Sequence, residues 1–200
     1  MRWPHLRNNL WLAGIVLAVV AVWWFTERKD LTPPTQHVGG YEVLSGGKLV
    51  PSRDNDGDSF HLRHNGQDYH FRLYFVDAPE KRRFKLNEKR VQDQARYFGI
   101  DAEQSVEIGL AARDYATDLV DRGNFKVYTR WKAVFDSGRF YAFVIFDDGQ
   151  DLSEKLTAQG LARIHTEGAT HPDGRSVQEF NGTLRALERA AKANQMGGWR

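Results

Sequence analysis

The stretch DGDSFHLRHNGQDYHFRLYFVDAPE, residues 56–80, decides the fold because it holds the clearest local pattern in the chain. Apolar side chains alternate at Phe60 and Leu62, and again from Tyr69 to Phe75, which is the period of a β-strand with one buried face. Asn65-Gly66 lies between the two runs and supplies the two positive-φ residues of a type I′ turn. The stretch therefore predicts a β-hairpin that turns at Asn65-Gly66.

This hairpin brings acidic residues from both ends of the stretch together. Asp58 lies seven residues before the turn and Asp77 eleven after it, so both are expected at the open end. Alternation places the Asp58 side chain on the barrel side with Phe60, and Arg72 on the face opposite Leu73. Carboxylates gathered there would repel each other unless a cation or a proton joined them. Oxygen ligands without histidine favour calcium or magnesium.

The acidic run that begins at Asp54 does not make a complete calcium loop. An EF-hand loop needs glycine at its sixth position and glutamate at its twelfth, and here those positions hold Ser59 and Asn65. A strand follows instead of a helix. Asn55-Asp56-Gly57 is good turn chemistry, whereas the position of Asp58 at a strand end is not explained by a turn alone. Asp54 is expected to face solvent.

The rest of the domain is predicted as mixed α+β. Further strands are expected at 48–51, 125–135, 139–148 and 161–165, with a turn at 136–138. Capping boxes begin helices at Asp101 and Ser176, and a shorter helix is expected over 151–159. Five strands, with helices after the third and after the fifth, predict a five-stranded β-barrel of the OB type decorated with about three helices.

The N-terminal part has a different character. Residues 10–25, LWLAGIVLAVVAVWWF, are an unbroken apolar run that as a helix would be roughly 24 Å long, close to the thickness of a bilayer core. Trp11 and Trp23-Trp24 stand at its ends, where indole rings prefer the membrane interface. We expect one transmembrane helix before the domain. The predicted order is a basic segment at 1–9, the anchor at 10–25, a linker at 26–40 and the domain at 41–200.

A cleaved signal peptide is the alternative for this segment, because Val19-x-Ala21 resembles a small-residue cleavage site. The tryptophans near the end of the run favour the anchor. Either alternative places the domain outside the cytoplasm, in the periplasm or the extracellular space, anchored in one case and secreted in the other.

Composition excludes several classes of site. The chain of 200 residues contains no cysteine, so disulfides, cysteine-ligated zinc and thiol nucleophiles are excluded. Without the first thirty residues, bases and acids balance at 24 each, so a polyanion has to be bound by a local patch. The candidate patch is EKRRFKLNEKR, residues 80–90, with six bases and two acids. An ordinary solvated loop is the commoner fate of such a run.

Several blocks of sequence, in order, resemble the staphylococcal nuclease-like, or thermonuclease, family. Residues 56–80 resemble its Asp-Gly-Asp-Thr/Ser strand start, its Arg-Leu pair and its Val-Asp-x-Pro-Glu. SGRFYAFVIFDDGQDLSEKLTAQGLARI, residues 137–164, is similar to its Gly-Arg strand, Asp-Gly turn and helix end. LRALERAAKANQMGGWR, residues 184–200, is similar to its closing helix and Gly-x-Trp tail. The resemblance covers about residues 45–200 and implies the OB-type fold.

The resemblance also implies a function and a set of site residues. It implies calcium-dependent endonuclease cleavage of DNA or RNA that leaves 3′-phosphate ends. The implied calcium ligands are the carboxylates of Asp58 and Asp77 and the main-chain oxygen of Ala78, with Asp56 behind them. The implied catalytic residues are Arg72, Glu80 and Arg139, of which Glu80 would activate or position water and the arginines would stabilise the extra negative charge. Lys81, Arg82 and Arg83 are expected to contact substrate.

The chain departs from the family pattern at several positions. Ala78 replaces a threonine, and Ser137 replaces an aromatic residue. Residues 165–168, His-Thr-Glu-Gly, stand where tyrosines often hold the nucleotide, and the segment 81–99 is longer than the usual loop. Two alternatives therefore remain: a catalytically inactive OB module that binds nucleic acid, and a calcium-binding surface module. No protein partner is implied, and a monomer is expected.

Overall fold

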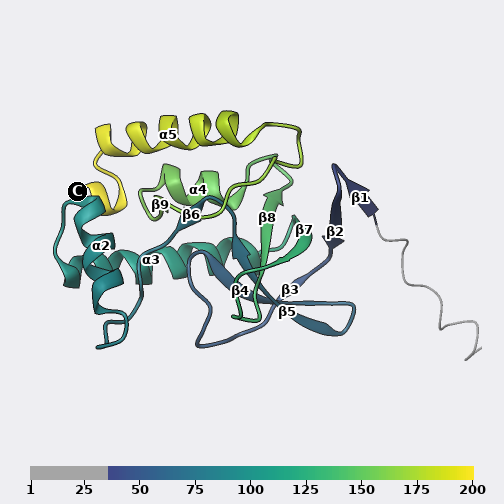
Figure 1. Ribbon diagram of the computed structural model, residues 1–200, viewed down its shortest axis with the longest axis horizontal. Coiled ribbons are helices and arrows are strands. Elements are labelled where there is room, and N and C mark those ends of the chain that lie inside the picture. Colours follow the sequence, from purple (N-terminus) through teal and green to yellow (C-terminus); the bar gives the residue numbers. More distant parts are fainter. Residues whose placement is uncertain (1–35) are drawn as a thin grey trace, which may run out of the picture. The chain divides into compact units, whose positions relative to one another are not determined.

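The computed structural model describes one unit, residues 36–200 (Figure 1). The predicted transmembrane segment at 10–25 lies outside the described residues. Within 36–200 no helix combines the length and the apolar character needed to cross a membrane. Residues 36–38, which lie in the expected linker, pair with the strand that follows them.

A seven-stranded sheet forms the centre of this unit, with strand order β1-β2-β7-β8-β5-β4-β3. The strands are β1 Gln36–Val38, β2 Tyr41–Ser45, β3 Lys48–Leu49, β4 Ser59–His64, β5 Gln67–Leu73, β7 Phe125–Ala133 and β8 Phe140–Phe146. Neighbours are antiparallel except β5 and β8, which are parallel. In the chain only Gly46-Gly47 separates β2 from β3, although four strands lie between them in the sheet. The chain thus bends from one side of the sheet to the other, as a small barrel requires.

Two short strands lie outside this sheet. β6 Val76–Asp77 follows β5 almost directly, and β9 Arg163–Ile164 pairs with it in antiparallel register. The pairing sets Asp77 directly opposite Arg163. A strand at 161–165 is therefore confirmed, but it pairs with β6 and does not belong to the main sheet.

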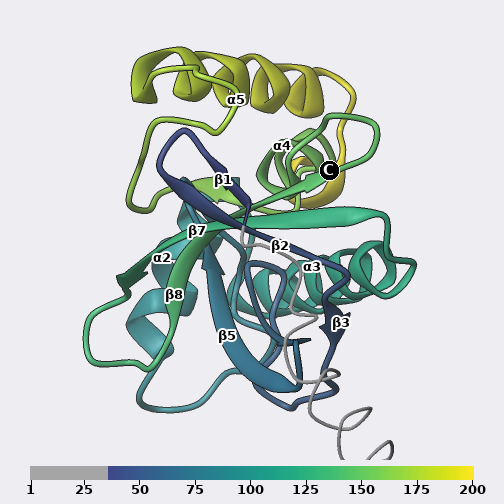
Figure 2. The same ribbon diagram turned by 90° about the vertical axis from the view of Figure 1, so that its right-hand side faces the viewer.

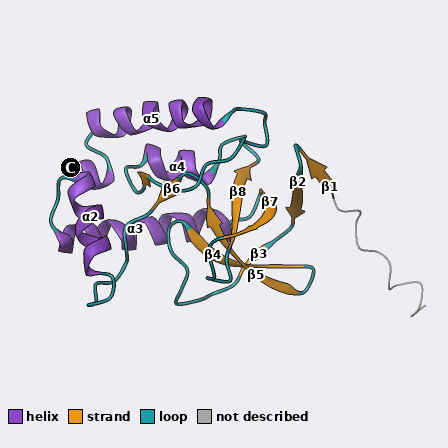
Figure 3. Cartoon of the chain, viewed as in Figure 1, coloured by secondary structure: helices purple, strands orange, loops and turns teal. Residues whose placement is uncertain are grey.

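Four α-helices lie beside the sheet, and Figure 3 shows them apart from most of the strands. They are α2 Glu88–Phe98, α3 Ala102–Asp121, α4 Leu152–Ala158 and α5 Val177–Ala193, and the 3-10 turn η2 Gly197–Trp199 follows. α4 packs against α5, and both views of the ribbon show these two helices side by side (Figures 1 and 2). The capping boxes at Asp101 and Ser176 are confirmed, and Asp151 caps α4 in the same way.

The mixed α+β class is confirmed, and the arrangement is consistent with an OB-like fold. The predicted numbers of strands and helices are too low, because the described residues hold nine strands, in an open sheet and a separate pair, and four α-helices. The missed helix is α2, which occupies most of the segment that was expected to be an extended loop. Its buried residues Val91, Ala95 and Phe98 have helical spacing, but the charges around them hide the pattern.

The predicted hairpin is confirmed in detail. Asn65 and Gly66 have φ angles of 50° and 78°, as a type I′ turn requires. Phe60 pairs with Phe71 across the hairpin, and both rings are buried in the core. Register on this hairpin is therefore fixed by the turn and by burial together, which aligns the residues at its open end.

Candidate active site

The end of β5 is shaped to turn Asp77 back toward the hairpin. Phe75 has a φ of 67°, a left-handed conformation that costs a non-glycine residue about 1–2 kcal/mol. Its buried ring packs 4.8 Å from the ring of Phe180, and its backbone N–H donates to the carbonyl of Glu167. These contacts hold the kink, and β6 begins immediately after it. Asp77 thereby lies beside the last residues of β5.

Arg72 joins the two aspartates at the open end of the hairpin. Its Nη1 lies 2.6 Å from Asp58 Oδ1 and its Nη2 lies 2.7 Å from Asp77 Oδ1. All three side chains are at most 8% exposed. The prediction that alternation places Asp58 and Arg72 on opposite faces is wrong, because β4 begins at Ser59 and Asp58 belongs to the preceding loop. The cation that the carboxylates require is, in this structure, a guanidinium.

Asp77 is the most heavily paired carboxylate of the site. Its Oδ1 accepts from Arg72 and from Arg90, at 2.7 and 2.6 Å. Its Oδ2 accepts from Gln94 and from Arg163, at 2.9 and 2.8 Å. The sequence analysis predicted Arg72 at this position but not the other three partners of Asp77, which are Arg90, Gln94 and Arg163. Arg90 and Gln94 come from the unpredicted helix α2, and Arg163 arrives through the pairing of β9 with β6.

The pKa values of the two aspartates are shifted in opposite directions. Burial raises the pKa of Asp58 to about 6, and the charge of Arg72 opposes that rise. Burial would also raise the pKa of Asp77, but Arg90 and Arg72 outweigh it and hold that pKa well below its usual range. The difference follows from the number of partners, since Asp77 has three guanidinium groups and Asp58 has one.

Glu80 lies next to this cluster on the loop after β6. Its Oε1 lies 3.0 Å from Arg90 Nη1, and its Oε2 accepts a hydrogen bond from Asn87 at 3.1 Å. The Glu80 N–H donates to the side chain of Gln94, so α2 fixes both its backbone and its carboxylate. The side chain remains 20% exposed, which leaves one edge open to water or substrate.

Arg139 faces the cluster from the start of β8. Its Nη1 donates to Ser59 Oγ at 3.2 Å and its Nε to Ser137 Oγ at 3.1 Å. Within residues 36–200 it has no carboxylate partner, so its charge is available to a ligand. Ser137 thus orients this guanidinium.

Two adjacent cavities open onto these residues. One, of about 620 Å³, is lined by Arg72, Arg90, Arg139 and Arg163 among others. The other, of about 360 Å³, is lined by Glu80, Arg139, His70 and Ser59 among others. Arg139 lines both, so the two cavities adjoin at this residue. Carboxylates also line the two cavities, Asp77, Asp93 and Glu167 in the first and Asp54, Asp56 and Glu80 in the second. Arg139 is therefore the guanidinium of the two cavities that is best placed to bind a phosphodiester.

The other expected site residues have more varied surroundings. Lys81 is buried, and its Nζ donates to Asp56 Oδ1 and to the carbonyl of Asn55, which ties the loop before β4 to the loop after β6. Arg83 is paired with two glutamates, Glu88 and Glu103. Arg82 is exposed and donates only to the backbone oxygen of residue 53. Of the three predicted substrate contacts, Arg82 is therefore the one that presents an unneutralised charge.

The donor atoms proposed for a metal are oxygens of the class that calcium binds. In the described part of the chain, no three or more His, Cys, Asp or Glu side chains gather into a metal site, so the set is limited to two carboxylates and a carbonyl. Asp58 Oδ2 and the Ala78 carbonyl each accept one hydrogen bond and keep one lone pair. Both oxygens of Asp77 are fully used. Arg90 is the partner most able to move away and free an oxygen of Asp77, because its side chain is 42% exposed. The side chains of Arg72 and Arg163 are at most 9% exposed. The donor set therefore fits calcium once Arg90 gives up its hydrogen bond to Asp77.

Helix α3 packs unusually close to the loops that carry the site, and two glycines permit this. A Cβ on Gly57 would lie 2.7 Å from the Cβ of Ala112 on α3. A Cβ on Gly109 would lie 2.4 Å from the carbonyl oxygen of Pro79 and 2.6 Å from that of Glu80. The absence of a side chain at Gly57 thus allows its loop to lie against α3. The absence of a side chain at Gly109 allows the backbone of Glu80 to lie against the same helix.

Replacing Gly109 by alanine is expected to destabilise the domain by about 1–3 kcal/mol, because the new methyl group displaces the Pro79–Glu80 backbone. Chemical denaturation measures the loss of stability. The matched control is Gly182→Ala on α5, where nothing lies within 4 Å and alanine is the better helix former. Equal behaviour of the two variants would contradict the assigned role of Gly109.

Comparison with known proteins agrees with this geometry. A family model described as staphylococcal nuclease homologue matches residues 70–200. A search of curated proteins gives no match. The family match includes Arg72, Asp77, Glu80 and Arg139 and begins after Asp58, whose place in the site rests on its contacts with Arg72 and Ala78. Since the match spans well over half of the sequence, the chain belongs to the staphylococcal nuclease homologue family.

Proposed function

We propose that this chain is a calcium-dependent nuclease that hydrolyses phosphodiester bonds in DNA or RNA. The observation that supports it best is the position of Arg139, which lines one cavity with Glu80 and the adjacent cavity with Arg72. A phosphate held by Arg139 would have a carboxylate on one side and buried guanidinium groups on the other. Membership of a nuclease family supports the same reaction.

In the proposed reaction Glu80 positions a water molecule and accepts its proton. The water oxygen forms a bond to phosphorus, the bond from phosphorus to the 5′ oxygen breaks, and that oxygen takes up a proton, which leaves a 3′-phosphate. Arg72 and Arg139 stabilise the additional negative charge on the phosphate oxygens, an electrostatic effect that is strong in a site with little water. Arg90 and Arg163 extend the positive surface on which the phosphate lies.

Calcium held by Asp58, Asp77 and the Ala78 carbonyl would add positive charge beside the same phosphate, with Asp56 behind these ligands. Arg90 competes for Asp77, so the proposed site binds calcium more weakly than the same oxygens would alone. Arg82 contributes to substrate attraction from the rim, while Lys81 and Arg83 act mainly through the loop they stabilise.

The purified full-length chain is expected to nick supercoiled plasmid in the presence of calcium and to stop when EGTA is added. Gel electrophoresis measures the conversion. Asp58→Asn is expected to raise the calcium concentration needed for half-maximal activity at least tenfold, because it removes one charged ligand. The control is Asp68→Asn, which changes an exposed carboxylate on the same hairpin.

Two results would argue against this function. Cleavage that persists in EGTA would remove the calcium requirement while leaving a nuclease. Binding of DNA without cleavage under calcium, magnesium and manganese would identify the chain as a catalytically inactive nucleic-acid-binding module.

We further propose that residues 10–25 anchor the domain in a membrane and that the domain faces the periplasm or the extracellular space. The support is the sequence alone: the apolar run and its flanking tryptophans. Secretion after signal-peptide cleavage is the alternative, and the mass of the mature N-terminus distinguishes the two. The proposed partners are the nucleic acid and the membrane, and the chain is proposed to act as a monomer.

A further inference from the structure

A third cavity continues the line of the two that contain the site residues. Its volume is about 680 Å³, and it lies between α3 and the loops that flank Asp56 and Glu80. It shares Arg53, Lys81 and Arg82 with the cavity beside Glu80, just as that cavity shares Arg139 with the arginine-lined one. The three cavities therefore adjoin one another in a row, called the groove below, with the cavity beside Glu80 in the middle.

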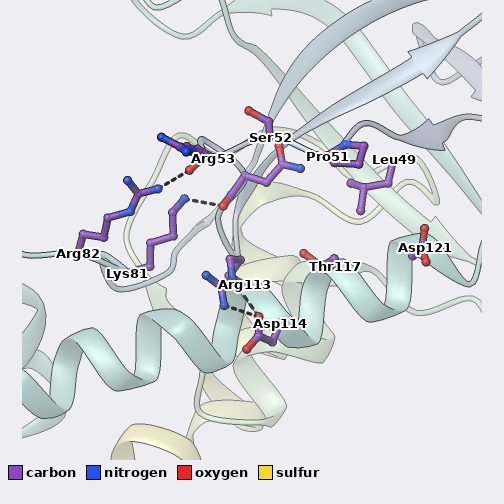
Figure 4. Close-up of a pocket in the computed structure, with 11 residues that line it drawn as sticks. Leu49, Pro51, Ser52, Arg53, Lys81, Arg82, Arg113, Asp114, Thr117 and Asp121 are labelled. Atoms are coloured by element: carbon purple, nitrogen blue, oxygen red, sulfur yellow. Dashed lines mark hydrogen bonds and ion pairs between the residues drawn. The ribbon is translucent and has the colours of Figure 1, made fainter.

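The third cavity is lined by more bases than acids, with Arg53, Lys81, Arg82 and Arg113 against Asp114 and Asp121. Figure 4 shows Arg53 and Arg82 on one side of the cavity and Arg113 rising from α3 on the other. Within residues 36–200, neither Arg53 nor Arg82 pairs with a carboxylate, and Arg82 contacts only the carbonyl of Arg53. Arg113 is paired with its neighbour Asp114. Two exposed, unpaired guanidinium groups beside a cavity match the requirement for a phosphate group.

The cavity also has space and apolar surface for more than a phosphate. Leu49 and Pro51 form part of its lining, and its volume lies within the range of about 300–1,000 Å³ found for small-molecule sites. That is enough for the sugar and base of one nucleotide, whose ring would rest on the apolar residues while its phosphate faces the arginines.

We propose that this cavity is a nucleotide subsite through which a polynucleotide strand continues beyond the scissile phosphate, with Arg53 and Arg82 holding its backbone. This inference rests on the proposed function for its ligand class, and it adds Arg53, which lies before the family match at residues 70–200, to the residues that bind substrate. A strand that reaches this cavity is expected to bind more tightly than a dinucleotide, because it makes more phosphate contacts.

The test measures binding without cleavage. Fluorescence anisotropy in EGTA gives the Kd of the full-length chain for a labelled single-stranded DNA of roughly 20 nucleotides. The double variant Arg53→Ala, Arg82→Ala is expected to raise this Kd about tenfold and to reduce the slope of log Kd against log salt by roughly 1.4, since each lost phosphate contact contributes about 0.7 for a single strand. Binding of a dinucleotide is expected to stay unchanged.

The matched control is Arg185→Ala, Arg189→Ala on α5, which removes the same charge from exposed positions that line none of the three cavities. It is expected to change the Kd less than twofold. Equal weakening in the two double variants would overturn the subsite, because net charge alone would then explain the loss. An absence of binding by the unmodified chain would overturn it as well. Failure to hydrolyse DNA with calcium, by contrast, bears on the proposed nuclease and leaves this binding result intact.

Discussion

Replacing Glu80 by glutamine is expected to lower kcat by about 10²–10⁴-fold, because the amide cannot accept the proton of an attacking water. Glutamine has nearly the same shape, so the hydrogen bond from Asn87 and the backbone bond to Gln94 can persist. The fold and the KM should therefore change little. Steady-state kinetics on a labelled oligonucleotide, together with circular dichroism and thermal unfolding, separate loss of chemistry from loss of structure.

The matched control for this variant is Glu103→Gln. Glu103 also pairs with an arginine of the 80–90 segment, but its side chain is 73% exposed and it lines none of the groove cavities. It should retain normal kcat. A Glu80→Gln variant that keeps more than a tenth of the activity would show that another group accepts the proton, and the assignment of Glu80 would then fail.

The features that the sequence predicted correctly are those set by neighbouring residues. Asn65-Gly66 forms its turn from two adjacent residues, and the caps at Asp101 and Ser176 need only a partner three positions away. Such signals do not depend on the rest of the fold. The candidate residues at the hairpin's open end followed from the same local pairing.

The features that the sequence did not predict depend on tertiary contacts. Arg163 reaches Asp77 across 86 residues, and only the pairing of β9 with β6 brings them together. Arg90 belongs to a segment whose charges favoured a loop, and its role appears only once α2 packs beside the site. Spacing could thus place Asp58, Asp77 and Arg72 at one end of the hairpin, but it could not place Arg90 and Arg163, which also pair with Asp77.

Replacing Arg72 by alanine is expected to lower the free energy of unfolding by about 3–5 kcal/mol, as is usual when one partner of a buried ion pair is removed. Asp77 keeps Arg90 and Arg163, but Asp58 loses its charged partner while it remains buried. Urea denaturation in EGTA measures the change. The control is Arg63→Ala, which breaks an exposed Arg–Asp pair on the same hairpin and should cost little.

The destabilisation is also expected to depend on pH with a defined sign. In the native chain burial raises the pKa of Asp58 to about 6, above the unfolded value near 4, even with Arg72 opposing the rise. Such a carboxyl favours the folded state at low pH, and this contribution is lost as the pH rises through the window between the two values. Removing Arg72 removes the charge that lowers the pKa of Asp58, so this pKa rises further and the pH range over which stability is lost extends to higher pH. The variant should therefore lose more stability at about pH 8 than at about pH 5.

Calcium should restore part of this lost stability, and the size of that recovery tests the proposed metal ligands without any measurement of activity. With Arg72 gone, Asp58 and Asp77 remain close together and bind a divalent cation more strongly than in the native chain, because no guanidinium bridges them. A ligand that binds only the folded state raises its stability in proportion to the logarithm of its concentration. Calcium should therefore raise the unfolding midpoint of Arg72→Ala more than that of the unmodified chain or of Arg63→Ala. If all three proteins respond equally, the two aspartates do not form a cation site, and the guanidinium of Arg72 is their permanent partner rather than a neighbour of the metal.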